Sequence, residues 1–549
     1  MTKNIKQLVF ITVSVFLMVN CSDNLEIDNP SAVTDDFYNS KLGQEKLLID
    51  IYSKYRSVFN TGELQYYGTD LYMAITESQN ERMFNGYDSS FNSTAGVVGS
   101  YWSNLYKIVQ ESNTLLSRSS LETEEMTLDY YNEITAETRV LRAFAYYYLV
   151  ETFGAVPFYT TEQSEVITDV ERTPENEIYK FIIEDLTEAV SLLSWEVEDP
   201  GRVNKATALQ LLGKFYLTRA YKPYSESSDF DMASKYFDMI IEDSESPYQL
   251  LDSYALVYDE NNQNNSEVIW AIQYGLDKNY VGSGNPQQSL FGFNIVALEP
   301  DLFDRVQTDY SSMSRQYWVN PRVHELFENP YVDSRYDVTF QREFYVNNQN
   351  SADLGKLGIF FPRWNDTSGN TNDAINFYPF KEEGEYKWYP QSTALPILNT
   401  GLDRMPIIKK FKDTKIDWQA PGSRKDVIFR LSDTYLLSAE AHLGAGNFDQ
   451  VLNRINTLRR RAAVTPSERD NMEVSTVDLD FILDERAREL LGEHDRWFDL
   501  KRTGKLIERA KEYNIFVDKY NNINEMHLVR PIPQDEINKV NGLIQNQGY

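Results

Sequence analysis

Apolar residues recur at helical spacing through most of the first half of the chain. Between residues 36 and 56, for example, Phe37, Leu47 and Ile51 fall on one face of a 3.6-residue repeat. The same periodicity predicts further helices at about residues 101–116, 128–153, 173–193, 205–221 and 231–243.

Two of these predicted helices carry end signals. Gly154 directly follows the helix at 128–153, and Pro157 comes shortly after it, which is common C-terminal punctuation. Thr173 is placed to cap the helix at 173–193, with Pro174 in its first turn. The sequence therefore predicts a sharp break between the two helices.

Helices of this size, joined by short connections, predict a tetratricopeptide-like stack. Small residues next to aromatic ones, as in Ala143-Phe144 and Gly213 to Tyr216, fit such a repeat, although no strict period can be counted. We therefore expect a mainly α fold built on a helical repeat scaffold.

Two stretches lack this periodicity. Residues 68–100 are polar, and a polar stretch of that length is usually functional or disordered. Residues 276–419 are rich in Asn, Gly, Pro and aromatic residues, which predicts short strands and long loops apart from a helical run at 321–327. Helical periodicity returns at 430–443, 448–463, 479–491 and 497–511.

The layout is two helical blocks, at about 36–275 and 420–549, that enclose an irregular aromatic-rich segment at about 276–419. Length alone suggests several domains, at roughly 150 residues each. A repeat-like scaffold can carry such a length as one unit. Because we expect the two blocks to pack together, we interpret residues 36–549 as a single domain.

The first twenty residues differ in character from the rest. Lys3 and Lys6 give a positive start, and residues 8–19 are almost entirely apolar. That run is too short to span a bilayer and fits the hydrophobic region of a secretory signal. Cys21, which follows it, is the single cysteine of the chain, so no internal disulfide can form.

This segment resembles a bacterial lipoprotein signal, although Met18 and Asn20 stand where other residues are usual. The resemblance implies that residues 1–20 are removed and that Cys21 is acylated, for example with palmitate. Two or more acyl chains anchor a protein stably without a transmembrane helix, and residues 21–35 would then form an acidic tether. The alternative is a free cysteine buried beside an uncleaved helix.

The net charge of the chain and the motifs that it lacks argue against several classes of function. Acidic residues outnumber basic ones by 83 to 53, for a formal net charge of -30. Such a field repels DNA and RNA, and it disfavours anionic polysaccharides unless a local basic pocket overrides it. The four histidines lack metal-binding spacing, and no Gly-x-Ser-x-Gly elbow occurs. We therefore expect no nucleic-acid partner, no metal and no cofactor.

Catalysis of glycoside hydrolysis needs two opposed carboxylates, roughly 5 to 9.5 Å apart. One predicted helical region gathers four candidates, Glu485, Glu489, Glu493 and Asp499. Arginines at 486, 488 and 496 lie near ion-pair spacing from them. We therefore interpret these carboxylates as parts of a salt-bridged helix pair, and expect a protein that is not an enzyme.

Several segments, in order along nearly the whole chain, resemble the SusD/RagB family. The longest is AETRVLRAFAYYYLVETFGAVP, from Ala136 to Pro157. The C-terminal ones include RLSDTYLLSAEA from Arg430, in which Ser432 replaces the usual Ala, and RWFDLKRTG from Arg496. The remaining matches are EDLTEA (184–189), GRVNKA (201–206), NTLRRRA (456–462), DERAREL (484–490), PIPQ (531–534) and the ending QNQGY (545–549).

The resemblance implies an outer-membrane lipoprotein on the cell surface that binds a polysaccharide or oligosaccharide. It also implies a partner, a SusC-like TonB-dependent transporter that receives the glycan. Two alternatives stay open: a relative of the same family that captures peptides, and a glycoside hydrolase or lyase on a helical scaffold.

Sugar binding without catalysis needs flat apolar faces and polar side chains. Trp270 and Trp497 lie among apolar or motif residues, and we expect both in the core. Tryptophans among polar residues of the irregular segment are candidate ligand-facing rings: Trp318, Trp364, Trp388 and Trp418. The family resemblance adds residues near the 68–100 stretch as site candidates: Arg82, Tyr87, Trp102 and Asn104.

Overall fold

A computed structural model gives the structure of most of the chain. It describes residues 35–60, 62–74, 79–119, 126–277, 282, 284–291, 299–304, 317–363, 387–388, 406–416 and 422–549. For residues 35, 36, 79–82, 387 and 388 only the backbone is described. The predicted signal peptide, Cys21 and most of the acidic tether lie outside the described residues.

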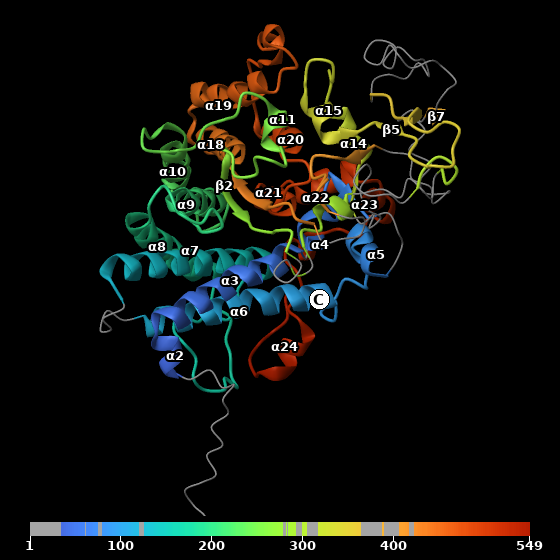
Figure 1. Cartoon of the computed structure of the whole chain (residues 1–549). Coiled ribbons are helices and arrows are strands. Elements are labelled where there is room, and N and C mark those ends of the chain that lie inside the picture. Colours follow the sequence, from blue (N-terminus) through green and yellow to red (C-terminus); the bar gives the residue numbers. More distant parts are fainter. Residues whose placement is uncertain are drawn as a thin grey trace, which may run out of the picture.

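Helices dominate both blocks (Figure 1). The first block contains α2 (Asp35–Asn39), α3 (Lys41–Asn60), α4 (Glu63–Tyr66), α5 (Gln79–Gly86), α6 (Gly96–Arg118), α7 (Leu128–Phe153), α8 (Glu175–Leu192), α9 (Lys205–Ala220), α10 (Asp229–Glu242) and α11 (Tyr254–Val257). The last block contains α18 (Leu431–Ala445), α19 (Phe448–Arg461), α20 (Leu479–Glu489), α21 (Arg496–Arg502), α22 (Leu506–Tyr513), α23 (Ile515–Tyr520) and α24 (Gln534–Lys539).

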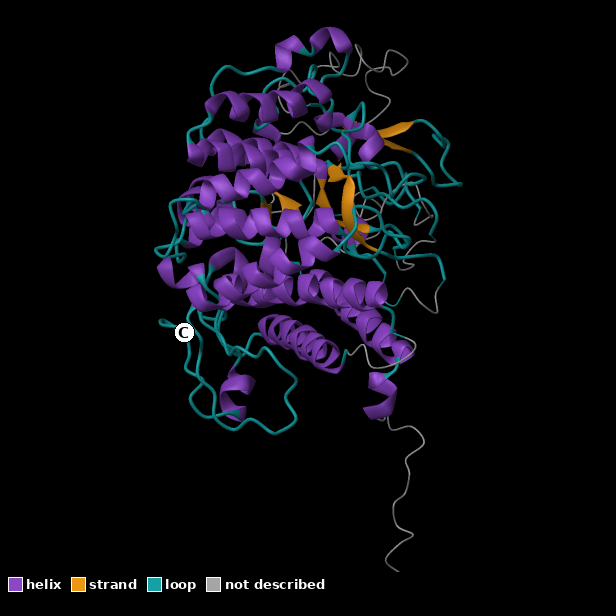
Figure 2. Ribbon diagram, turned by 90° about the vertical axis from the view of Figure 1, so that its left-hand side faces the viewer, coloured by secondary structure: helices purple, strands orange, loops and turns teal. Residues whose placement is uncertain are grey.

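These helices form a continuous stack that crosses from one block to the other. Helix α3 packs on α6, α6 on α7, α7 on α8, α8 on α9, α9 on α10, α10 on α18, and α18 on α19. Figure 2 shows the stack with the strands and many of the long loops gathered on one side of it. The predicted mainly α, tetratricopeptide-like scaffold is confirmed.

Close packing in this stack explains one element of the sequence pattern. A Cβ atom on Gly213 of α9 would lie 2.6 Å from the ring of Phe237 on α10. Because real Cβ contacts are longer than that, the two helices can approach so closely only with glycine at 213. The small-residue signal at this position is therefore a helix–helix contact.

Short strands connect the blocks and the middle segment. Strand β2 (Val268–Ile272) pairs antiparallel with β9 (Asp426–Arg430), so the end of the first block joins the start of the last. The other pairs are β1 (Tyr72–Met73) with β3 (Trp318–Val319), β4 (Phe340–Gln341) with β8 (Ile407–Ile408), and β5 (Glu343–Tyr345), β6 (Leu357–Phe360) and β7 (Lys387–Trp388) in one sheet. The middle also holds α12 (Gln287–Leu290), α14 (Pro321–Glu325) and α15 (Arg335–Thr339).

Helix ends match the sequence prediction in one case and differ in others. Helix α7 spans the predicted residues and ends at Gly154, whose φ of 75° suits glycine. Helix α8 starts after Pro174, so Thr173 is not its N-cap. The helix predicted at 497–511 is divided into α21 and α22 at Gly504, which has a φ of 70°. The polar stretch at 68–100 contains a helix, α5, and a strand, β1.

A buried network of carboxylates and cations joins the last helical block to the middle segment. Glu489 of α20 accepts hydrogen bonds from Arg430 at 2.8 Å, Arg461 at 2.6 Å and Arg335 at 3.1 Å. Glu493, in the turn after α20, accepts a hydrogen bond from Arg430 at 2.7 Å. These two acidic residues are ion-paired, as predicted. Their partners are cations of other elements and not the neighbouring arginines 486, 488 and 496 that the sequence suggested.

The other acidic residues of this region are paired in the same way. Glu485 meets Arg335 at 2.8 Å, and Asp499 of α21 meets Arg486 at 2.7 Å. Burial alone would raise the pKa of each carboxyl group, but the surrounding guanidinium groups outweigh it and lower the pKa of Glu489 to about 2. These carboxylates therefore stay charged at neutral pH and are structural.

We expect Glu489→Gln to lower the free energy of unfolding by about 3–5 kcal/mol, because three guanidinium groups would lose a shared buried counter-ion. Urea denaturation followed by circular dichroism measures the change. Glu536→Gln is the control, since its ion pair with Lys539 lies at the surface and should change stability by less than about 0.5 kcal/mol. Equal effects of the two substitutions would contradict the structural role of Glu489.

Acid should unfold the protein by protonating buried, ion-paired carboxylates. Glu489 is one of them, and Glu151 of α7, which pairs with Lys222 and Lys501, is another. The pKa values of Glu489 and Glu151 are about 2 in the folded protein, below the usual value of 4.5. The stability that they supply is complete above pH 4.5 and is lost as the pH falls toward 2. We expect the urea midpoint to drop between roughly pH 6 and roughly pH 3, and to drop less in Glu489→Gln. An equal drop in both proteins would argue against this source of acid sensitivity.

Candidate functional site

The predicted aromatic residues whose side chains the structure describes are buried. Trp102 on α6 is 4% exposed, and its ring contacts Tyr106 and Phe153 at centroid distances of 4.8 and 4.9 Å. Trp318 in β3 is 8% exposed and pairs with Met73 of β1. As packed, neither ring offers an open face, so sugar contact by either one stays a prediction that requires the ring to become exposed.

Tyr87 also lies in the core, at 3% exposure. Its backbone has a φ of 46°, and its hydroxyl donates a hydrogen bond to the carbonyl of Gly68 at 3.0 Å. Its ring meets His527 edge-on at 4.9 Å. In this structure Tyr87 fixes the end of α5 against the C-terminal region.

The structure brings some of the predicted residues into one region. Asn85 of α5 exchanges two hydrogen bonds with Ala74, which follows β1, and β1 pairs with the strand that contains Trp318. This places Trp318 near α5 and Tyr87.

The other candidates are placed in part or not at all. Asn104 lies half-buried on α6. Arg82 and Trp388 belong to α5 and β7, with side chains outside the described residues, and Trp364 and Trp418 lie outside them altogether. By contrast, Trp270 and Trp497 are fully buried, as predicted for core residues.

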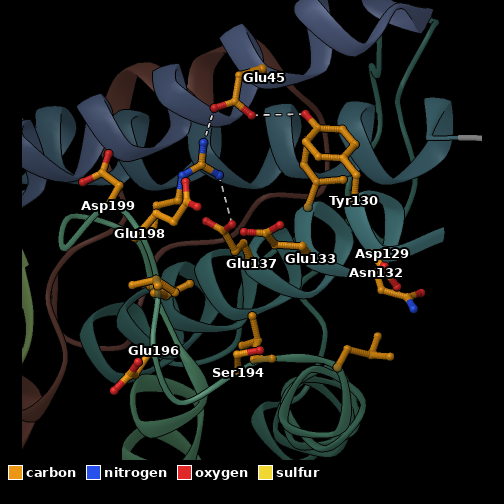
Figure 3. A pocket seen from close by; sticks show the side chains of 16 residues that line it. Glu45, Asp129, Tyr130, Asn132, Glu133, Glu137, Ser194, Glu196, Glu198 and Asp199 are labelled. Carbon is orange, nitrogen blue, oxygen red and sulfur yellow. Dashed lines mark hydrogen bonds and ion pairs between the residues drawn. The ribbon is translucent and has the colours of Figure 1, made fainter. Parts of the chain in front are cut away.

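A pocket of about 700 Å³ opens between α3, the start of α7 and the segment after α8 (Figure 3). Its lining is strongly acidic and comes from three separate parts of the chain. The carboxylates that line it are Glu45, Asp129, Glu133, Glu137, Glu196, Glu198 and Asp199.

One guanidinium group bridges the elements around this pocket. Arg202 pairs with Glu137 of α7 at 3.0 Å and with Glu45 of α3 (Figure 3). The hydroxyl of Tyr130 donates to the second oxygen of Glu45 at 3.1 Å, and the hydroxyl of Tyr52 donates to Glu137 at 2.5 Å. The bridge ties two helices to the connection that precedes α9.

Glu137 differs from the other lining carboxylates because it is 1% exposed. Burial raises its pKa, the charge of Arg202 opposes this, and the pKa settles at about 7. Near neutral pH the group therefore exists in both protonation states. Perturbed carboxyl groups in surface pockets are common at functional sites.

A second pocket, of about 410 Å³, adjoins the first, since Glu45, Asp199 and Arg202 line both pockets. The indole N–H of Trp270 donates to the carbonyl of Gly201 at 3.0 Å and so holds the connection against β2. The other residues that line it are Ile49, Tyr52, Ser53, Arg56, Ile272 and Gln273.

Neither pocket was predicted from the sequence. Arg202 lies 157 residues from Glu45 and 65 from Glu137, and no local pattern connects the three. The segment that contains Arg202 stood out only by its family resemblance. A pocket assembled from such distant residues becomes visible only in the folded chain.

Neither a metal site nor a membrane-spanning helix is found among the described residues. There, no group of three or more His, Cys, Asp or Glu side chains is arranged to hold a metal ion. No helix among the described residues has the length and apolarity that a membrane crossing needs.

Two family models match the chain. One, described as the SusD family, matches residues 266–549. The other, described as starch-binding and associating with the outer membrane, matches residues 23–217. The two matches together cover most of both helical blocks.

Individual relatives agree with these models. SusD-like protein P25 of Formosa agariphila is 26% identical over all of this chain and 99% of its own length. Starch-binding protein SusD of Bacteroides thetaiotaomicron is 26% identical over 78% of this chain and 75% of its own. A solved structure described as a laminarin binding SusD-like protein superposes with a TM-score of 0.67 at 23% identity, over 92% of this chain and 99% of that one. The chain belongs to the SusD family.

Proposed function

We propose that this protein binds a polysaccharide or oligosaccharide at the surface of the outer membrane without cleaving it. In this proposal it passes the glycan to a SusC-like TonB-dependent transporter. The observation that carries it is the match of both halves of the chain to family models, one of them described as starch-binding and associating with the outer membrane.

The architecture supports a binding role. The helical stack is fixed by close packing and buried ion pairs, so it can hold a binding surface in place. The described part of the irregular segment that contains α14, α15 and β5 lies to one side of that stack (Figure 1). The aromatic residues of the segment can supply flat faces for sugar rings. We retain Trp364, Trp388 and Trp318, with Arg82, Tyr87, Trp102 and Asn104, as proposed glycan-contacting residues.

Hydrolysis is not favoured by the carboxylates that sequence analysis singled out. Glu485, Glu489 and Glu493 each pair with buried cations that hold their pKa values well below the usual range. A general acid needs a pKa near the working pH. These residues are therefore unsuited to protonate a leaving group.

A binding screen tests the proposed function directly. We expect the purified protein to bind at least one member of a panel that contains starch, laminarin and other polysaccharides, and to release no new reducing ends from it. Peptides in the same panel test the alternative of a peptide-capturing relative. Binding of peptides alone, or release of reducing ends, would overturn the proposal.

Substitution of Trp364 tests the proposed binding face. We expect Trp364→Ala to weaken binding about fivefold, since one stacked ring contributes ~1 kcal/mol. Isothermal titration measures the change, and a thermal melt checks that the fold is kept. Phe448→Ala is the matched control, because Phe448 is a 61% exposed ring on α19, away from β7 in Figure 1. Equal binding by wild type and Trp364→Ala would remove this residue from the site.

The lipid anchor at Cys21 is also a proposal. We expect Cys21→Ser to move the protein from the outer-membrane fraction to the soluble fraction, because acyl chains attached there would supply the membrane affinity. Cell fractionation with an antibody, together with mass spectrometry of the mature N-terminus, measures this. Unchanged membrane attachment of the variant would contradict anchoring through Cys21.

A further inference from the structure

We propose that the two pockets on either side of Arg202 form one groove, and that this groove is a second carbohydrate subsite that accepts neutral sugar chains and rejects anionic ones. The inference rests on the proposed glycan-binding function and assigns it a further site, away from the aromatic segment. No residue of the groove was among the sequence-based candidates.

The two pockets share part of their lining. They share Glu45, Asp199 and Arg202, and the Arg202–Glu45 contact crosses between them. Their volumes of about 700 and 410 Å³ fall within the usual range for small-molecule sites. A short sugar chain could therefore lie across the bridge with residues in both pockets.

The second pocket has the mixture of side chains that a sugar ring requires. Ile49 on α3 is 48% exposed and offers an apolar face to C–H groups. Ser53 is exposed one turn further along the same helix, and Gln273 lies half-buried after β2. The Ser53 hydroxyl already donates to the carbonyl of Asp50 at 2.8 Å, and the Gln273 amide nitrogen donates to the carbonyl of Ala271 at 2.8 Å. Their side-chain oxygens can accept hydrogen bonds from sugar hydroxyls.

Asp199 adds a carboxylate at the junction of the two pockets. One of its oxygens accepts a hydrogen bond from the backbone N–H of Gly201 at 2.8 Å, which fixes its orientation. A carboxylate has several lone pairs and can accept further donors. The side chain is therefore oriented before any ligand binds, which lowers the entropic cost of recognition.

Charge decides which sugars fit. In the second pocket the carboxylates of Glu45 and Asp199 are balanced by the guanidinium groups of Arg56 and Arg202. In the first pocket Arg202 faces an excess of carboxylates and already pairs with Glu45 and Glu137. In the first pocket a sulfate or uronate group would thus meet net negative charge, whereas neutral hydroxyls would meet hydrogen-bond acceptors.

Blocking the second pocket tests the subsite. Ser53→Trp places a bulky ring in the pocket, whereas Ser57→Trp adds the same ring one turn along α3, on an exposed residue outside the lining. The probes are oligosaccharides of laminarin and of starch, titrated by calorimetry. We expect Ser53→Trp to reduce the binding stoichiometry by one site or to weaken the affinity at least tenfold. Ser57→Trp should bind like wild type.

A second measurement locates the contact without a substitution. Hydrogen exchange of the wild-type protein should slow in α3 and in residues 199–202 when the bound oligosaccharide is present. If an oligosaccharide binds but neither Ser53→Trp nor hydrogen exchange responds, the subsite is overturned while glycan binding stands. If none of these oligosaccharides and no polysaccharide of the panel binds, the proposed function fails, and the subsite fails with it.

Charge rejection has its own test. Carboxymethylated forms of the same oligosaccharides should bind to this groove at least tenfold more weakly than the neutral forms. The binding that Ser53→Trp loses measures how much of the total binding occurs in the groove. The double variant Glu196→Gln/Glu198→Gln removes two exposed carboxylates of the first pocket, so the difference in affinity between neutral and carboxymethylated forms should become smaller. Added salt should also reduce this difference in affinity, because it screens the charges. Equal binding of charged and neutral forms by wild type would overturn the proposed selectivity.

Discussion

Buried carboxylates of α20 and the following turn hold the architecture together. Glu489 alone contacts guanidinium groups from three places: Arg335 on α15, Arg430 at the end of β9 and Arg461 on α19. Desolvation makes such groups costly unless every partner is in position. The network therefore specifies how the middle segment and the last helical block fit together, because any other arrangement leaves a buried charge without its partner.

A series of contacts connects this network to the two pockets beside Arg202. Arg430 ends β9, and β9 pairs with β2. Strand β2 carries Trp270, whose indole N–H holds Gly201 next to Arg202. Arg202 then draws Glu45 and Glu137 together. The buried ion pairs and the surface pockets are thus parts of one continuous set of contacts.

The fold was largely predictable because it depends on local signals. Helix α7 ends where Gly154 stops it, and the stack follows from amphipathic periodicity and small residues such as Gly213. Where local signals compete, prediction failed: periodicity continues past Gly504, but the chain takes a left-handed turn there and starts a new helix.

The site was less predictable for two physical reasons. A tryptophan among polar residues in the sequence can still be covered in the fold, and Trp318 and Trp102 are both buried. Conversely, the groove gathers residues that no sequence spacing relates, since Glu45 and Arg202 meet only after α3 packs beside the connection that precedes α9. Burial and long-range pairing are properties of the folded chain, and a linear pattern carries little information about either.

The pairing of Asp70 with Arg496 and Arg509 has a consequence for how the protein reaches its folded state. These partners are 426 and 439 residues away along the chain, and Asp70 is fully buried between them. Contacts of such high sequence separation are slow to form, because the loop they close must be ordered first. During synthesis Asp70 therefore stays without these two partners until nearly the whole polypeptide has been made. Until then the incompletely folded first block exposes surface on which chaperones and proteases can act.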